Sequence, residues 1–189
     1  MRISKEPEVR KQEIIDTAMK VFAEKGYEAA AMKDIAAEMK IASGLCYHYF
    51  PNKQALYETA VRQYAEACSR PFIEIFKETR NSLKECMEQM GTLWLESERK
   101  GSYAYESFFH KKGNELFHKQ LDLEMIKEIL PYAVSYLEAR KQQNEIQVTD
   151  ARAAAVFILN GEVALINNHQ MSLEKRLELA QEFVIKVLQ

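Results

Sequence analysis

Apolar side chains recur at intervals of three and four residues along most of the chain, the spacing that places them on one face of an α-helix. The first apolar stripe contains Ile14, Ile15, Ala18, Met19 and Phe22. Pro7 suits the first turn of a helix, and Gly26 suits the residue that follows its last turn. This part of the pattern predicts a helix that begins after Pro7 and ends at Gly26.

Two shorter helices are expected next, joined by a break at residues 40–42. In the first, the positions i, i+3, i+4 and i+7 are held by Met32, Ile35, Ala36 and Met39. The second is expected from Ser43 to Phe50, where Pro51 stops it. The residues expected to face inward with Ile41 are Cys46, Tyr49 and Phe50. Those expected to face outward are Ser43, Gly44, Tyr47 and His48.

The rest of the chain is also predicted to be helical, in longer segments. Asn52 suits the N-cap of a helix from Lys53 to about Cys68. Further helices are expected at about 72–99, 102–118, 121–142, 150–168 and 173–188. Pro131 lies inside one of them and is expected to kink or divide it. The 189 residues include only 6 Gly and 4 Pro, and no useful stretch alternates as a strand would, so the predicted fold class is all-α.

The charge balance argues against a protein that binds nucleic acid over its whole surface. The formal net charge is −2. Residues 1–53 carry 9 Lys and Arg against 8 Asp and Glu, whereas residues 54–189 carry 17 against 20. Because the two parts differ so little, any contact with phosphates depends on where individual cations lie.

Several other classes of protein are not indicated by the composition. No apolar run approaches the length of a membrane span, and the first dozen residues lack the hydrophobic segment of a secretory signal. Cys46, Cys68 and Cys86 are odd in number and widely spaced, so neither a disulfide framework nor a zinc site is expected. The expectation is a cytoplasmic protein with reduced thiols, no cofactor and no membrane partner.

The pair of short helices has the layout of a helix-turn-helix, whose second helix enters the major groove of DNA. Its outward side combines small residues, which permit close approach, with side chains that donate to phosphates: Ser43, Gly44, Tyr47 and His48. Lys33 and Lys53 each lie at the start of a helix, where the lysine and the backbone amides both attract phosphate. The alternative is a pair of packed core helices with an ordinary solvated face.

The segment from Ile14 to Leu56 resembles the N-terminal domain of the TetR family of transcriptional regulators. The resemblance is carried by Ala18, Phe22, Gly26 and Tyr27, by Asp34, Ile35 and Ala36, and by Gly44, Tyr47, Tyr49, Phe50, Lys53 and Leu56. It implies a helix-turn-helix DNA-binding domain at residues 1–53 and a larger helical domain for effector binding and dimerisation at residues 54–189. The DNA-binding residues that it implies are Lys33, Ser43, Gly44 and Tyr47 on base edges, and Leu45, His48 and Lys53 on the backbone.

Three features depart from the pattern that the family usually shows. Ala31 stands where Ser or Thr usually caps the second helix, and the turn reads Lys40-Ile41-Ala42 in place of Gly-Val-Ser. Both usual N-caps are therefore missing, at a cost of roughly 1 kcal/mol each. Leu45 replaces a smaller residue, which loses a phosphate hydrogen bond but permits contact with a thymine methyl group.

Two stretches near the C-terminus are candidates for a dimer interface. Small and apolar residues form stripes on the expected helices at 150–168 and 173–188, and the candidate interface residues are Ala154, Ile158, Gly161, Leu165, Leu177 and Val184. Two such helices from each subunit can form a four-helix bundle across a two-fold axis. The TetR resemblance implies the same arrangement. The alternative is that both stripes face only the core of one subunit.

Aromatic and sulfur-containing side chains concentrate between residues 72 and 136, where they suit an apolar ligand cavity. The candidate ligand-binding residues are Met87, Met90, Trp94, Tyr105, Phe108, Phe109, Tyr132 and Asn160. The alternative is that most of them are simply core. His110 and His118 are eight residues apart, about two helical turns, so they are not expected to share a metal site.

The leading hypothesis is a ligand-responsive repressor. It would bind palindromic, double-stranded operator DNA as a homodimer and be released by a small apolar or aromatic effector. A helical interaction module with lost DNA binding is the alternative, supported by the missing caps and the nearly neutral N-terminal part. The sequence shows no nucleophile–base pair, phosphate-binding loop or metal cluster at a useful spacing, so an enzyme is not expected.

Overall fold

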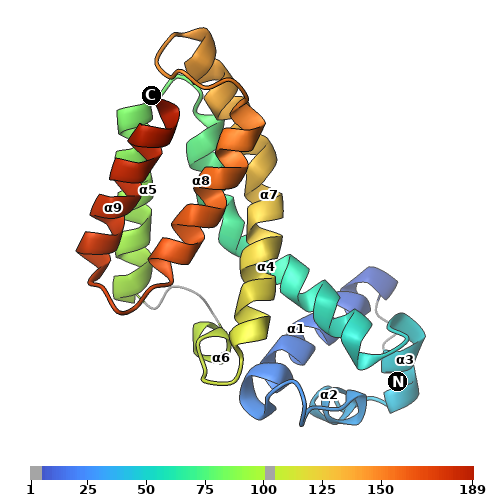
Figure 1. Cartoon of the computed structure of the whole chain (residues 1–189). Coiled ribbons are helices and arrows are strands. Elements are labelled where there is room, and N and C mark those ends of the chain that lie inside the picture. The colour runs from blue at the N-terminus through green and yellow to red at the C-terminus, as the bar shows by residue number, and fades with distance from the viewer. Residues whose placement is uncertain (1–5, 101–104) are drawn as a thin grey trace. The chain divides into compact units, whose positions relative to one another are not determined.

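The computed structural model describes residues 6–100 and 105–189, and within these ranges it contains helices and turns but no strand (Figure 1). The helices are α1 (Pro7–Lys25), α2 (Met32–Glu38), α3 (Ser43–Tyr49), α4 (Lys53–Lys77), α5 (Leu83–Lys100), α6 (Glu106–Phe109), α7 (Glu115–Gln142), α8 (Ala151–Ile166) and α9 (Leu173–Leu188). The predicted all-α fold class is confirmed.

The chain divides into two compact units. The first unit contains Met1–Ala65 and Ala104–Leu121, and the second contains Glu66–Tyr103 and Asp122–Gln189. The long helices α4 and α7 each contribute residues to both units. These packing units differ in their bounds from the functional division expected at residue 53, which stays a prediction.

In the first unit, α1 is held by the apolar stripe that the sequence pattern predicts. Its members are each at most 3% exposed: Ile14, Ile15, Ala18, Met19 and Phe22. Gly26 follows the helix with a φ of 83°, a conformation that favours glycine, and its N–H donates to the carbonyl of Phe22. Both the stripe and the end of this helix are confirmed.

Aromatic rings from distant parts of the sequence meet in the core of the first unit. The ring centroid of Phe117 lies 5.3 Å from that of Tyr27 and 5.3 Å from that of Tyr57. Phe109, at the end of α6, stacks on Tyr64 of α4 at 5.4 Å. Such ring pairs stabilise the folded state by more than the burial of their apolar surface alone. The segment around α6 is therefore part of the same core as the N-terminal helices.

The second unit is built from α5, α8 and α9 with the last part of α4 and most of α7. Within it, α9 lies beside α5 and α8 (Figure 1). Tyr136 of α7 is fully buried, and its hydroxyl donates to the carbonyl of Asn81 at 3.1 Å. Arg140 is only 2% exposed and pairs with Glu145 at 3.0 Å. The bond from Tyr136 to Asn81 and a further bond from Arg140 to the carbonyl of Thr79 fix the turn before α5 to α7.

Prolines interrupt the helices less than the sequence predicts. The predicted end of α4 near residue 68 is wrong, because α4 continues through Pro71 to Lys77. The helix α7 is likewise not divided at Pro131. Each proline removes a backbone donor and strains the preceding turn. Burial of neighbouring apolar side chains such as Phe72 and Ile129 offsets that cost.

The helix expected at 102–118 is replaced by the short α6, a turn, and the start of α7 at Glu115. Gly113 lies in this turn with a φ of 96°, and the side-chain amide of Asn114 donates to the carbonyl of Phe108 at 2.7 Å. These local features break the apolar pattern that suggested one continuous helix. Residues 101–104, where that helix was expected to begin, lie outside the described residues.

Candidate functional site

The helices α2 and α3 are joined by the short turn that a helix-turn-helix requires. At the end of α2, the N–H of Lys40 donates to the carbonyl of Ala37, and the N–H of Ile41 donates to that of Ala36. This pair of bonds is a Schellman cap. It places Lys40 at a φ of 55°, in the left-handed region that favours glycine. The turn therefore forms at a conformational cost that glycine would not have.

Neither of these short helices has a capping side chain. Ala31 and Ala42 occupy the N-cap positions of α2 and α3 with extended backbone and no side-chain cap. At α2, the carboxylate of Asp34 accepts a hydrogen bond from the N–H of Ala31 at 2.8 Å, which is half of a capping box. Lys25 donates to the same carboxylate at 2.9 Å, and this bond is the main cause that lowers the pKa of Asp34. The missing caps are thus compensated at α2 only in part.

The helix α3 exposes one side and buries the other, as the sequence pattern predicts. Four residues, which we call the α3 face, are exposed: Ser43, Gly44, Tyr47 and His48. Tyr47 is a large side chain of this face, and 54% of it is exposed. On the opposite side, Cys46 is 0% and Phe50 4% exposed, while Ile41, Leu45 and Tyr49 are partly buried. The fold therefore presents small and hydrogen-bonding groups on a helix seated by its apolar side.

Positive charge around α2 is partly neutralised within the first unit. Lys20 pairs with Glu38 at 2.6 Å, and Lys25 pairs with Asp34 at 2.9 Å. Lys33 is exposed and has no ion pair within the part of the chain that the structure describes. Its ammonium group is therefore available to a phosphate or a base edge.

Lys53, the second lysine of the predicted DNA-binding set, has internal partners. Its ammonium group donates to the carbonyl of Tyr27 at 2.7 Å and to that of Glu28 at 3.3 Å. It also lies 4.3 Å from the centroid of the Tyr27 ring. Two of its three N–H groups are thus used to hold the start of α4 against the turn after α1. One N–H remains for the predicted backbone contact.

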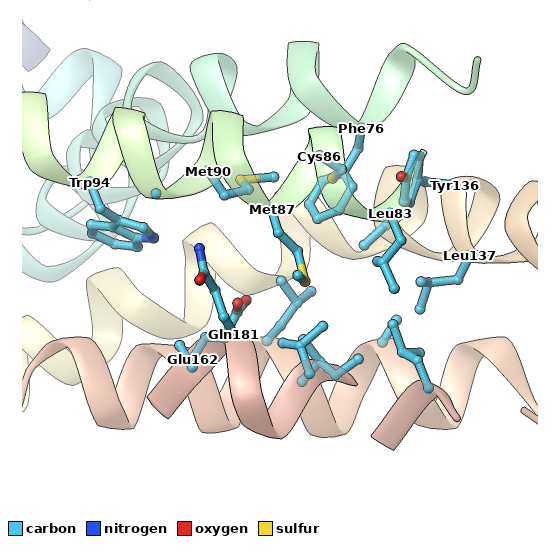
Figure 2. Close-up of a pocket in the computed structure, with 18 of the residues that line it drawn as sticks. Phe76, Leu83, Cys86, Met87, Met90, Trp94, Tyr136, Leu137, Glu162 and Gln181 are labelled. Carbon is cyan, nitrogen blue, oxygen red and sulfur yellow. The ribbon is translucent and has the colours of Figure 1, made fainter. Parts of the chain in front are cut away.

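The second unit contains an apolar cavity with two lobes, which we call the C-terminal cavity. The first lobe has a volume of about 60 Å³ and the second about 70 Å³. Residues that line both lobes are Phe76, Met90, Trp94, Leu159 and Glu162. Figure 2 shows the first lobe, with Met87, Met90 and Trp94 on one side and Glu162 and Gln181 on the other. Lobes of this size hold a few waters or a small chemical group.

The structure brings only three of the eight predicted ligand-binding residues to this cavity: Met87, Met90 and Trp94. Tyr105, Phe108 and Phe109 lie instead in the first unit, where Tyr105 packs against Tyr64 at 5.5 Å between ring centroids. Tyr132 is 37% exposed, and Asn160 is exposed with its amide donating to the carbonyl of Val156 at 2.8 Å. Neither of these two polar residues lines a lobe.

Sequence reasoning missed the polar residues of the C-terminal cavity, Glu162 and Gln181. Glu162 is the single charged side chain lining the first lobe within the described residues, and burial raises its pKa to about 7. A signal was present, because Glu162 is the only charged residue between Ala153 and Ile166, a stretch whose only other polar side chain is that of Asn160. A lone acid in such a helix is costly unless it serves a purpose.

The outer side of α8 and α9 forms an apolar groove, lined by Phe157, Ile158, Gly161, Ala164, Leu165, Phe183, Val184 and Val187 among others. Phe157 is 67% and Phe183 50% exposed. Of the predicted interface residues, Gly161 and Leu165 line this groove, and Ile158 and Val184 line both the groove and the first lobe. The other two, Ala154 and Leu177, lie inward in the core and the first lobe.

His110 and His118 lie closer together than their spacing in one helix would allow. Their ring centroids are 4.4 Å apart, because the turn after α6 folds the chain back. Within the described residues no three His, Cys, Asp or Glu side chains form a group that could hold a metal ion. The same residues include no helix long and apolar enough to cross a membrane.

Comparisons with known proteins agree with the helix-turn-helix. Residues 14–60 match the family model described as bacterial regulatory proteins, tetR family. The chain is 47% identical over 51 residues to YuxN, an uncharacterized HTH-type transcriptional regulator of Bacillus subtilis. It is 38% identical over 52 residues to IcaR, the negative transcriptional regulator of the biofilm operon icaADBC in Staphylococcus aureus. These matches cover 27% and 28% of this chain, but only 18% of YuxN and 28% of IcaR.

Over almost its whole length the chain shares its fold with solved structures. A Mesorhizobium loti protein assigned to the TetR family of transcriptional regulators matches with a TM-score of 0.69 at 17% identity, covering 97% of each chain. GusR of Salmonella enterica matches with a TM-score of 0.68 at 20% identity, also covering 97% of each chain. At sequence identities of 17% and 20%, these similarities show a shared fold and nothing about function.

An exposed helix that follows a short turn, on an all-α chain with a second helical unit, has the layout of a helix-turn-helix protein. The match over residues 14–60 specifies this segment further: it is similar to the N-terminal domain of the TetR family. The predicted resemblance of the N-terminal segment to this family is confirmed.

Proposed function

We propose that this protein is a transcriptional repressor that binds palindromic, double-stranded operator DNA as a homodimer and responds to a small ligand. The observation that carries DNA binding is the exposed α3 face, seated by the buried Cys46 and Phe50. Lys33 adds an available charge beside it. Repression is proposed because IcaR, which resembles the N-terminal segment, is a negative regulator.

DNA binding is tested by fluorescence anisotropy of the full chain with the DNA upstream of its own gene, against a scrambled duplex. Affinity for the upstream DNA is expected to fall at least about tenfold between 50 and 200 mM salt, because phosphate contacts release counterions. Tyr47→Ala is expected to weaken binding by about tenfold. Tyr132→Ala, which removes an exposed tyrosine from α7, is the matched control. Equal binding to both duplexes would refute the proposal.

The proposed partner at the outer groove of α8 and α9 is a second copy of this chain. Phe157 and Phe183 leave large apolar surfaces in water, and Gly161 and Ala164 permit close approach of another helix. A helix-turn-helix that recognises a palindrome also requires two copies. Sedimentation is expected to show a dimer, and Phe183→Glu a monomer. Leu116→Glu, at a residue of α7 that is 79% exposed, is the control and is expected to stay dimeric.

The proposed ligand response uses the helix that both units share. Phe76 of α4 lines both lobes of the C-terminal cavity and Phe72 lines the second, while α4 begins at Lys53, directly after the helix-turn-helix. A ligand that displaces these rings acts on the same helix that Lys53 fixes to Tyr27. Such a coupling lets ligand binding and DNA binding alter each other's affinity.

A dimeric interaction module without DNA binding is the second candidate. The internal pairing of Lys20, Lys25 and Lys53 favours it, because it reduces the charge available to phosphates. A dimer that shows no salt-dependent DNA binding would support this candidate over a repressor. We propose no enzymatic activity, since the relatives named above are regulators.

A further inference from the structure

We propose that Glu162 makes the C-terminal cavity selective for an apolar cation. The ammonium group of the ligand would lie against the carboxylate, and its apolar part would lie against Met87, Met90 and Trp94. The inference rests on the proposed ligand-binding role of the cavity and names the chemical class of the ligand.

The first step is that the carboxylate of Glu162 lacks a partner. Neither a cation nor a hydrogen-bond donor contacts it within the described residues. It faces both lobes of a cavity whose walls are otherwise almost entirely apolar. Glu162 is half-buried, and it also lines the outer groove of α8 and α9. An unpaired carboxylate among apolar walls is destabilising until an opposite charge reaches it. The cavity is therefore electrostatically incomplete at this residue.

The second step is that nearby basic residues are already engaged. Lys186 lines the outer groove, as Glu162 does, but its ammonium group binds Glu182. Arg140 is buried and pairs with Glu145. Neither residue pairs with Glu162, so the positive charge in this proposal comes from a molecule that enters the cavity.

The third step distinguishes an organic cation from other ligands. A metal ion needs several ligating side chains, and the described residues hold no cluster of them here. A neutral apolar molecule would leave the carboxylate unpaired. Trp94, Phe76 and Tyr136 add aromatic rings, whose faces attract cations. The small lobes fit a compact head group, and the flexible Met87 and Met90 can shift to admit a longer apolar part.

Several other titratable groups line the same space and must be separated from Glu162. Burial raises the pKa of Cys86 to about 11 and also raises that of Tyr136, so both stay neutral at pH 6–8. Asp122 lines the second lobe and accepts a hydrogen bond from Asn167 at 3.1 Å. Gln181 is neutral, and Lys186 lies on the groove side.

The test uses the full chain and two small probes of nearly equal shape, the cation 2-phenylethylammonium and the neutral 2-phenylethanol. Binding is followed by the fluorescence of Trp94, which is the only tryptophan of the sequence and lines both lobes. The ammonium probe resembles lysine, whose pKa is about 10.4, so it stays charged between pH 6 and 8. Variants are Glu162→Gln, Asp122→Asn and, as a matched control, Glu178→Gln on the exposed side of α9.

The ammonium probe is expected to bind at least about tenfold more tightly than the alcohol at pH 8. Its affinity is expected to fall about tenfold from pH 8 to pH 6, because a carboxylate with a pKa of about 7 is mostly protonated at pH 6. Glu162→Gln should remove both effects, whereas Asp122→Asn and Glu178→Gln should retain them. Circular dichroism of each variant checks that it is folded.

The proposal is overturned if the alcohol binds as tightly as the ammonium probe, if Glu162→Gln leaves the preference unchanged, or if the pH dependence disappears in Asp122→Asn instead. These readouts do not involve DNA. Failure of this inference is therefore distinguishable from failure of the proposed repressor function, which the anisotropy measurement tests separately.

Discussion

Removing the carboxylate of Glu162 should stabilise the protein, and increasingly so as the pH rises. The pKa of this group is about 7 in the folded chain against a reference of 4.5. The folded state therefore holds the proton more tightly than the unfolded state, so stability is lost as the pH rises from about 4.5 to about 7. Glu162→Gln keeps the shape of the side chain but has no proton to lose.

The magnitude follows from the two pKa values. Each pH unit between them corresponds to about 1.4 kcal/mol, so the full cost of ionisation is about 3 kcal/mol above pH 7. At pH 5 the same linkage gives a cost of only about 0.8 kcal/mol. The advantage of Glu162→Gln over the parent chain should therefore grow by about 2.5 kcal/mol between pH 5 and pH 8.

The assay is urea denaturation of the full chain at pH 5, 6, 7 and 8, followed by circular dichroism. Glu178→Gln serves as the control, because it removes the same charge from an exposed pair with Lys175. Its stability relative to the parent should hardly change with pH, since exposed pairs contribute little. If the difference between Glu162→Gln and the parent is the same at every pH, the carboxylate is not desolvated and the reasoning is refuted.

Three further predictions concern the helix-turn-helix and are read as free energies of unfolding. Ala42→Ser should stabilise the chain by about 1 kcal/mol, because serine caps the N-terminus of α3; no gain would mean that water already caps it. Lys40→Gly should stabilise the chain by up to about 1 kcal/mol, because glycine adopts the positive φ at this position without strain. Its control is Lys33→Gly inside α2, which should destabilise the chain by about as much. A change of the same sign in both variants would contradict this account. Lys53→Met should destabilise by about 1–3 kcal/mol through loss of the bonds to the carbonyls of Tyr27 and Glu28, and an unchanged stability would show that these bonds contribute nothing.

The N-terminal helices could be predicted from sequence because their signals are local. The stripe around Phe22 and the glycine after it specify α1, and Asn52 caps α4 by accepting from the N–H of Ala55 at 2.8 Å. Cys46 and Tyr47 are neighbours, and helical geometry alone directs one inward and the other outward. In each case three or four neighbouring residues are enough to specify where a helix ends or which side chain is buried.

The ligand cavity could be predicted only in part, because packing between distant segments decides which aromatic residues line it. Trp94 and Phe109 both fitted an apolar site by composition, but Phe109 packs on Tyr64 in the other unit. Pro71 is a strong local signal for a helix end, yet burial of the neighbouring Phe72 helps α4 continue. Tertiary burial outweighs local propensity at these positions.

The participation of residues 104–121 in the first unit limits how the helix-turn-helix of this protein can be exchanged for that of a relative. Grafting a relative's residues 1–53 onto this chain would pack a foreign α1 against α6 of this chain, because α1 and α6 are in contact within the first unit. A functional chimaera therefore has to carry the matching segment around α6 as well. Recombination at a single crossover point would separate residues that must be inherited together.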